Sequence, residues 1–290
     1  MPWNSALTLS YVGVSMDNQV VMYPYNEVGP GAYPDLQAAK PYPALGQVNV
    51  LRNMAKSWYN GLQAKWERRF TNGFSFMGSY AFSKNLSQDM PQYETDRLIP
   101  FAPAGYTRGR SAWDRTHILA VNAVYELPFG RGRAHMANAN RLVDFALGGW
   151  ELSGIETFTS GAPLTVTVPG ATLGNGWDTR ANLVGDPRIS NPSASTWFNT
   201  AAFAAPAKYA FGNSGMGIID APGVHNLDLA LMKNFHLTES KYFQFRWEAF
   251  NALNHVNLSE PGTTLGTPNF GVIRSAGAAR TMQLGLKFLF

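Results

Sequence analysis

The last ten residues, TMQLGLKFLF at positions 281–290, alternate between two kinds of side chain. The apolar side chains occupy the even positions, which are Met282, Leu284, Leu286, Phe288 and Phe290. The odd positions carry Thr281, Gln283, Gly285 and Lys287, and only Leu289 breaks the pattern. Because successive side chains of a β-strand point to opposite faces of the sheet, this stretch predicts a strand with one apolar and one polar face.

The same alternation recurs upstream in segments of about ten residues. It is clear in YFQFRWEAFN (242–251), NLDLALMKNF (226–235) and FSFMGSYAFS (74–83). It is weaker at 119–129, 62–66 and 7–11, and a further segment that begins at Trp150 loses it near Ile155 and Glu156. We therefore expect an all-β protein with about eight antiparallel strands.

The connections between these segments alternate between short and long. The short ones are 71–73 and 238–240, with a moderate one at 130–149; the long ones are 16–56, 84–114, 161–223 and 256–278. In an antiparallel meander this order places all short turns at one end of the sheet and all long loops at the other. Asp114, Arg115 and His117 fall where one long loop enters a strand, and we expect them to support folding at the loop base.

One-sided loops and one apolar face favour a transmembrane β-barrel, whose turns are short on the periplasmic side and whose loops are long on the outside. A sheet that crosses hydrocarbon must close on itself, because lipid offers no partner to backbone N–H and C=O groups. A soluble antiparallel sandwich that binds carbohydrate remains an alternative. The residues expected to face lipid are Phe74, Phe76, Tyr80, Phe82, Leu227, Leu229, Leu231, Phe243, Phe245 and Trp247. Lys65, Glu67, Arg246 and Glu248 are the expected polar residues of the lumen.

Composition excludes several other classes. The 290 residues include no cysteine, which excludes a disulfide scaffold, a zinc ribbon and cysteine catalysis, and no segment approaches the roughly 18 apolar residues of a spanning helix. Enzyme motifs are missing, so we expect neither catalysis nor a cofactor or metal. The net charge of +4 comes from scattered Lys and Arg, a distribution that does not favour nucleic-acid binding.

Five phrases occur together in this chain: YNGLQAKWERRFTNGFSFMGSYAFSKNL (59–86), WDRTHILAVNAVYELPFGRGR (113–133), GGWELSGIETFTSGAPLTV (148–166), FRWEAFNALNHVN (245–257) and QLGLKFLF (283–290). With them the chain resembles the C-terminal barrel region of TonB-dependent outer-membrane transporters, most closely the Oar-like receptors with a carboxypeptidase-regulatory-like domain. The resemblance covers essentially all of residues 1–290 as one partial barrel domain.

That resemblance implies a barrel of 22 strands around a plug, energised by TonB, that imports a bulky ligand such as a siderophore, a glycan or a peptide. This chain departs from the family, since we find no plug, no TonB-contacting segment and no signal peptide in it. We therefore expect a C-terminal barrel wall in the outer membrane, surrounded by lipid, that meets the TonB complex only through the missing plug. Its extracellular ligand is unknown.

The terminal strand is also similar to the signal that the outer-membrane assembly machinery reads, which carries over to Met282, Leu284, Leu286, Phe288 and Phe290. One further alternative is a self-standing eight-stranded barrel that acts as an adhesin or structural anchor. Such a small barrel fills its interior with side chains, whereas the expected inward positions Gly61, Ser75, Ser79, Ala81 and Ala120 are small.

Overall fold

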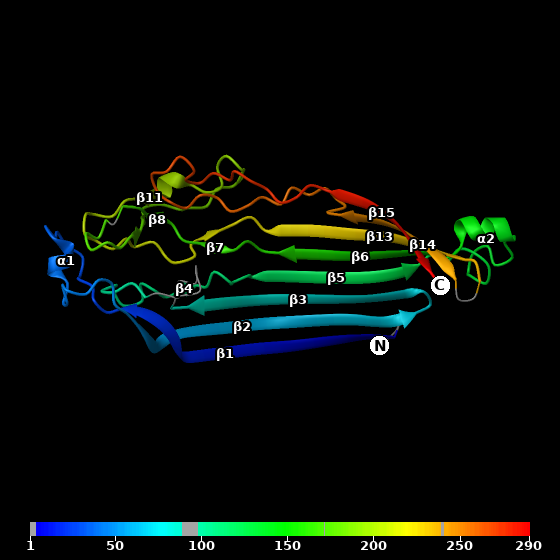
Figure 1. Ribbon diagram of the computed structural model, residues 1–290, viewed down its shortest axis with the longest axis horizontal. Helices are drawn as coiled ribbons and strands as arrows, with labels where there is room; N and C mark the ends of the chain where they lie inside the picture. Colours follow the sequence, from blue (N-terminus) through cyan, green and yellow to red (C-terminus); the bar gives the residue numbers. More distant parts are fainter. Residues whose placement is uncertain (1–3, 89–97, 171, 239–240) are drawn as a thin grey trace.

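The computed structural model describes residues 4–88, 98–170, 172–238 and 241–290. One antiparallel sheet of nine strands runs along most of its length, in the order β1-β2-β3-β5-β6-β13-β14-β15 with β4 beside β3 (Figure 1). The strands are β1 (Ser5–Pro24), β2 (Asn49–Thr71), β3 (Phe74–Ser87), β4 (Gly109–Arg110), β5 (His117–Glu126), β6 (Trp150–Thr159), β13 (Val224–His236), β14 (Tyr242–Phe250) and β15 (Thr281–Leu289). Within the described residues β1 and β15 each pair with a single strand, so the sheet is open.

This architecture confirms the predicted antiparallel all-β fold. The sheet has one strand more than the sequence analysis expects, because the two residues of β4 are too few to show alternation. It also forms a single layer, with no second sheet of comparable size among the described residues. A two-sheet soluble sandwich is therefore wrong for this chain. No described helix has the length and the apolar character needed to cross a membrane.

The first two strands are longer than expected. The sequence predicts a loop over 16–56, whereas β1 continues to Pro24 and β2 already begins at Asn49. The pairing register shifts between Met16 and Val20, and Asn18 has a φ of 58°. A β-bulge of this kind adds an unpaired residue and reverses the alternation of side chains. The alternating pattern therefore ends at the bulge although the strand continues.

Short and long connections lie at opposite ends of the sheet, as predicted (Figure 1). At the short-turn end, β2 and β3 are joined through Asn72 and Gly73, whose φ angles are 53° and 76°. Two consecutive positive φ angles fit the tight hairpin turn that follows the twist of the strands. The connection from β5 to β6 at this end holds the helix α2 (Arg141–Leu147), which Asn140 caps by accepting a hydrogen bond from the N–H of Val143.

The long connections pack together at the other end into what we call the loop body: residues 25–48, 98–116, 160–170, 172–223 and 251–280. It contains the helix α1 (Leu36–Ala39), the 3-10 helix η2 (Thr200–Ala202) and three two-stranded ladders. The ladders pair β7 (Pro163–Leu164) with β12 (Ile219–Asp220), β8 (Thr167–Val168) with β9 (Thr179–Arg180), and β10 (Asn182–Leu183) with β11 (Phe203–Ala204).

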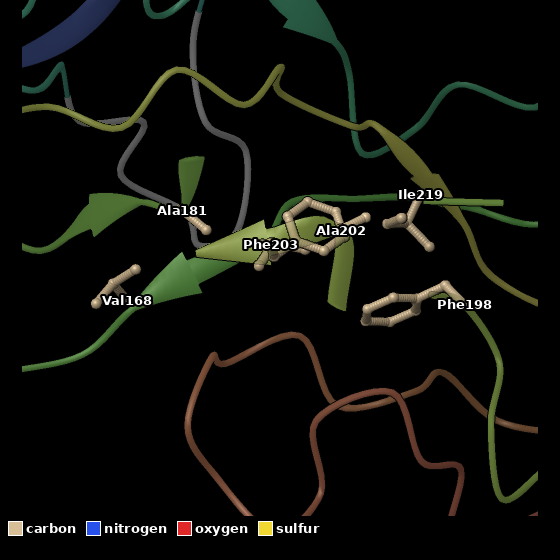
Figure 2. Packing of buried hydrophobic residues seen from close by; sticks show 7 residues of the cluster. Val168, Ala181, Phe198, Ala202, Phe203 and Ile219 are labelled. Atoms are coloured by element: carbon tan, nitrogen blue, oxygen red, sulfur yellow. The ribbon is translucent and has the colours of Figure 1, made fainter. Parts of the chain in front are cut away.

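The largest group of buried apolar side chains lies in the loop body. Figure 2 shows this cluster, which consists of Val166, Val168, Ala181, Phe198, Ala202, Phe203 and Ile219. Phe270, from the connection between β14 and β15, packs against it, with its ring centroid 5.2 Å from that of Phe198. The loops are thus ordered by their own core, while much of the apolar side of the sheet stays exposed.

Candidate functional site

One face of the sheet is apolar across all eight long strands. Pairing registers define this face, because directly opposed residues of neighbouring strands point the same way. One row of such residues consists of Phe74, Tyr125, Leu152, Leu231, Trp247 and Leu284. All ten residues predicted to face lipid lie on it: Phe74, Phe76, Tyr80, Phe82, Leu227, Leu229, Leu231, Phe243, Phe245 and Trp247. Their contact with lipid stays a prediction.

Ionisable residues interrupt this apolar face at several positions, including Arg68 opposite Phe76 and His117 opposite Phe82. Glu156 of β6 stands opposite Val121 and Leu227, and its Oε1 lies 2.9 Å from Nε2 of His225. Lys233 of β13 stands opposite Trp150 and is almost completely buried. Sequence reasoning missed Glu156 because the apolar Ile155 lies on the polar face and the charged Glu156 lies on the apolar face. Both residues nevertheless keep regular strand pairing. The loss of alternation in β6 was the signal.

The opposite face carries the four residues predicted for the lumen, and these residues form two ion pairs. Nζ of Lys65 lies 2.5 Å from Oε2 of Glu67, and Nη2 of Arg246 lies 2.8 Å from Oε1 of Glu248. The first pair belongs to β2 and the second to β14, with four long strands of the sheet between them. Each carboxylate is balanced by a cation on its own strand, and exposed pairs of this kind add little to stability because water screens them. The two pairs are separate features of a polar wall.

Asp114 lies where the loop body meets the sheet, at the loop base that the sequence predicts. Its carboxylate is fully buried and accepts hydrogen bonds from the N–H of Asn85 at 2.6 Å and from Nε of Arg110 at 2.7 Å. Arg110 also donates from Nη1 to Oδ1 of Asp220 at 2.5 Å. Burial lowers the pKa of Arg110, but its bonds to Asp114 and Asp220 outweigh burial and raise that pKa above the usual value.

This arrangement joins three parts of the chain that are distant in sequence: the end of β3, the connection into β5 and the long connection into β13. The other residues of the predicted loop base extend the joint. The carbonyl of Arg115 accepts a hydrogen bond from Oγ of Ser83, and the N–H of His117 donates to Oγ of Ser160. The loop body is therefore fastened by polar contacts to the end of the sheet.

A buried arginine inside the loop body was not expected from the sequence. The guanidinium of Arg180 lies 3.6 Å from the ring centroid of Tyr106, and its Nε has no hydrogen-bond partner. Burial lowers the pKa of Arg180, and the nearby Tyr106 offsets this only in part. Oη of Tyr106 accepts a hydrogen bond from the backbone N–H of Arg180 and lies 3.1 Å from Oγ1 of Thr179. Tyr106 thus contacts both residues of β9.

The loop body also contains an open cavity of about 630 Å³. Tyr33, Lys208 and Tyr209 line it together with small residues, and two backbone hydrogen bonds hold its walls in place. One joins the N–H of Gly31 to the carbonyl of Leu173 at 2.9 Å, and the other joins the N–H of Tyr209 to the carbonyl of Thr172 at 3.0 Å. Two phenol rings and one ammonium group suit contact with a polar organic ligand.

Sequence comparison provides the decisive observation for family membership. A family model described as an outer membrane beta barrel domain matches residues 1–283, which is nearly the whole chain. The chain belongs to the outer membrane beta barrel domain family. The predicted location in the outer membrane is thereby confirmed. Among curated proteins, no match to this chain is found.

A solved structure agrees with this membership of the outer membrane beta barrel domain family. The outer membrane transporter YddB from Escherichia coli superposes with a TM-score of 0.55 at 10% sequence identity. The match covers 99% of this chain and 30% of that chain. At such low identity the similarity concerns the fold alone. This outer membrane beta barrel domain therefore spans less than a third of the protein that it matches.

The terminal strand of the outer membrane beta barrel domain is its most exposed one. The predicted assembly signal lies on the apolar face of β15, where Phe243 packs against Phe288 at 4.7 Å between ring centroids, and Phe290 follows the end of the strand. Leu284 is 72% exposed. Within the described residues, one edge of β15 has no partner strand. A free edge with apolar side chains is able to accept a further strand.

Proposed function

We propose that this chain is the C-terminal barrel wall and external loop assembly of a TonB-dependent, Oar-like outer-membrane transporter. Its ligand would be bulky: a siderophore, a glycan or a peptide. The proposal rests on one observation above all, the open sheet whose polar face is continuous across eight long strands and ends in two unpaired edges. A sector with free edges is the form expected of part of a wider barrel.

Three further features support this function. The polar face offers small side chains and balanced ion pairs, which suit a wide, water-filled lumen. The loop body at one end of the sheet has its own core and a cavity with two tyrosines, and in the proposed transporter it would capture ligand. The matched transporter YddB is about three times as long as the region that this chain covers.

The proposed division of labour gives this chain no catalytic role and no cofactor. Energy from the TonB complex would enter through a plug carried by another part of the protein. The assembly machinery would recognise the terminal strand, and β15 would then seal against the first strand of the complete barrel.

The absence of cysteine allows a direct test of the sector geometry. Single cysteines replace Thr8 or Ser10 in β1 and are combined with cysteines at Gln283 or Lys287 in β15, all on the polar face. In outer membranes, a disulfide within one chain would mean that β1 meets β15 in a closed eight-stranded barrel, which would refute the proposal. The expected result is no intrachain bond, whereas a control pair at the opposed residues Ser79 and Ala120 forms one.

Transport itself needs a second test on cells that produce the complete native protein. Uptake of labelled siderophores, oligosaccharides and peptides is compared before and after a protonophore collapses the proton gradient. We expect at least one class to accumulate only in energised cells, and deletion of β15 to abolish that accumulation. Accumulation that persists without the gradient would contradict TonB dependence.

A further inference from the structure

A second cavity lies at the short-turn end, far from the loop body. Its volume is about 710 Å³, and it is bounded by α2, the start of β6, the end of β13 and the start of β14. Four cationic side chains line it: Arg131, Arg133, Arg141 and Lys233. Nothing in the proposed uptake function uses this place, so its chemistry calls for a separate explanation.

Lys233 is the most unusual of these cations, because it lies on the apolar face and is only 2% exposed. Its Nζ donates a short hydrogen bond to the carbonyl of Gly148 and lies 5.3 Å and 5.0 Å from the rings of Trp150 and Phe235. An ammonium group has three N–H donors, and the described residues provide Lys233 with no carboxylate in ion-pair contact. A buried charge of this kind is stabilised by a counter-ion.

The carboxylates around the cavity are placed elsewhere. Glu126 pairs with Arg133 at 2.6 Å, and Oδ1 of Asp144 accepts a hydrogen bond from the backbone N–H of Arg131 at 2.7 Å. Glu151 stands opposite Glu126 on the polar face of the sheet. Within the described part of the chain, the guanidinium groups of Arg131 and Arg141 form no ion pair. Asp144 also acts on Lys233 through space, without an ion-pair contact, so the four cations of the lining face three carboxylates and leave an excess of one positive charge.

The same place also exposes apolar side chains. In α2, Leu142 is 81% and Phe145 57% exposed, and Leu147 is exposed beside them. The ring of Phe145 lies 4.9 Å from that of Phe235, which belongs to the apolar face. The helix therefore continues the apolar face beyond the end of β13. Basic, aromatic and aliphatic side chains gathered at the strand ends are typical of residues that sit at the bilayer interface.

We propose that this cavity binds one anionic diacyl phospholipid of the leaflet at the short-turn end. The lipid phosphate would accept hydrogen bonds from Lys233, Arg131 and Arg141, and the acyl chains would cover Leu142, Phe145 and the adjoining apolar face. A lipid is the occupant that fits, because the cavity adjoins a face that an outer-membrane barrel turns to the bilayer, and because its lining has one more cation than carboxylates. The inference does not depend on the proposed uptake function.

Native mass spectrometry of the complete chain in a mild detergent tests the site. Phosphatidylglycerol and phosphatidylcholine with the same acyl chains are titrated separately, and the bound lipids are counted. We expect one phosphatidylglycerol to bind more tightly than any phosphatidylcholine. The variant R131Q/R141Q should weaken that binding by about five-fold per charge removed. The matched control R52Q/R274Q removes two exposed arginines near the long-loop end and should leave it unchanged.

Several outcomes would overturn the proposal. These are equal binding of the two lipids, an equal loss of binding in R52Q/R274Q, or a dimer of the chain that forms only when lipid is absent.

Inorganic phosphate is added in a further arm of the experiment, and displacement of phosphatidylglycerol at equal concentration would identify a site for free phosphate instead. Lys233→Met should abolish the preference for phosphatidylglycerol, whereas Lys233→Arg should retain it. Heat-modifiable gel mobility checks whether each variant folds. If Lys233→Met does not fold, the loss of phosphatidylglycerol binding in R131Q/R141Q is the test of the proposal.

Discussion

Nε of Arg110 lies 2.7 Å from Oδ2 of Asp114, and this carboxylate has no exposed surface. The two residues are four positions apart in the chain but belong to no helix. Their bond closes the connection between β3 and β5, and Nη1 of the same guanidinium reaches Asp220 at the entrance to β13. A single buried carboxylate therefore carries much of the attachment between the sheet and the loop body.

Replacement of Asp114 should loosen this attachment. Asp114→Ala leaves Arg110 without its buried partner and removes the acceptor for the N–H of Asn85, for which we expect a loss of about 3 kcal/mol. Limited proteolysis of the folded protein in detergent should then cut within the loop body while the strands stay protected. The exposed carboxylate of Asp186 provides the control, since Asp186→Asn breaks a surface pair with Arg188 and should leave the cleavage pattern unchanged. Equal cleavage of both variants would contradict the role of Asp114.

Substitutions of Arg180 and Tyr106 should have opposite effects on the stability of the loop body. The lowered pKa of Arg180 means that burial disfavours its charged form, so ionisation of this group opposes folding at neutral pH. Arg180→Met keeps an unbranched side chain over the ring and should leave the loop body at least as stable. Tyr106→Phe removes the hydroxyl that contacts the N–H of Arg180 and Thr179, at a cost of about 1 kcal/mol. Hydrogen exchange of the amides in β8 and β9 measures both, and strong deprotection in Arg180→Met would refute this account.

The pair of Asp186 and Arg188 supplies a pH-dependent observable. Hydrogen bonds from the side chain and backbone of Arg188 lower the pKa of Asp186 below its ordinary value. Stability from this contact is therefore present above the ordinary aspartate pKa and is lost as the pH falls through the lowered one. A ¹³C NMR titration of labelled aspartate should give a lowered midpoint for Asp186, and Arg188→Gln should restore the ordinary value. An unchanged midpoint in that variant would show that Arg188 is not the cause.

The assignment of the apolar face to lipid can be tested with two adjacent residues of β13. Leu229 lies on the apolar face and Ala230 on the polar face, at the same depth in the sheet. Leu229→Arg should destabilise the protein folded in phospholipid vesicles by about 2–4 kcal/mol, because it places a charge in hydrocarbon. Ala230→Arg should cost much less, since it meets water in the lumen. Urea unfolding monitored by tryptophan fluorescence compares them, and a larger effect of Ala230→Arg would reverse the two faces.

The sequence predicts the sheet well where side-chain character follows the strand period. Phe243 to Trp247 and Met282 to Phe288 alternate without interruption, and their predicted face is the observed one. The prediction fails at Glu156, where a carboxylate occupies an apolar position, and beyond Met16, where a bulge reverses the alternation.

The loop body and the loop-base contacts were much less accessible to sequence reasoning. The strands of the loop body have two residues each, which is too short to show any period. Asp220, one partner of Arg110, lies 110 residues further along the chain. Local sequence patterns carry no information about contacts between residues so far apart in the chain. That Lys65 shares a face with Glu67, and Arg246 with Glu248, could be predicted because each two residues occupy positions i and i+2 of one strand.

The lengths of β1 and β2 set the height of the protein above the membrane. At about 3.3 Å per residue, the 23 residues of β2 extend roughly 75 Å, or about 50 Å along the bilayer normal when the strand is tilted by about 45°. The hydrocarbon layer takes up only about 30 Å of this. In the proposed transporter the remaining 20 Å or so would form a raised rim, so the cavity at Tyr33 and Tyr209 would open above the headgroup layer, where a large solute could approach it without first penetrating the membrane surface.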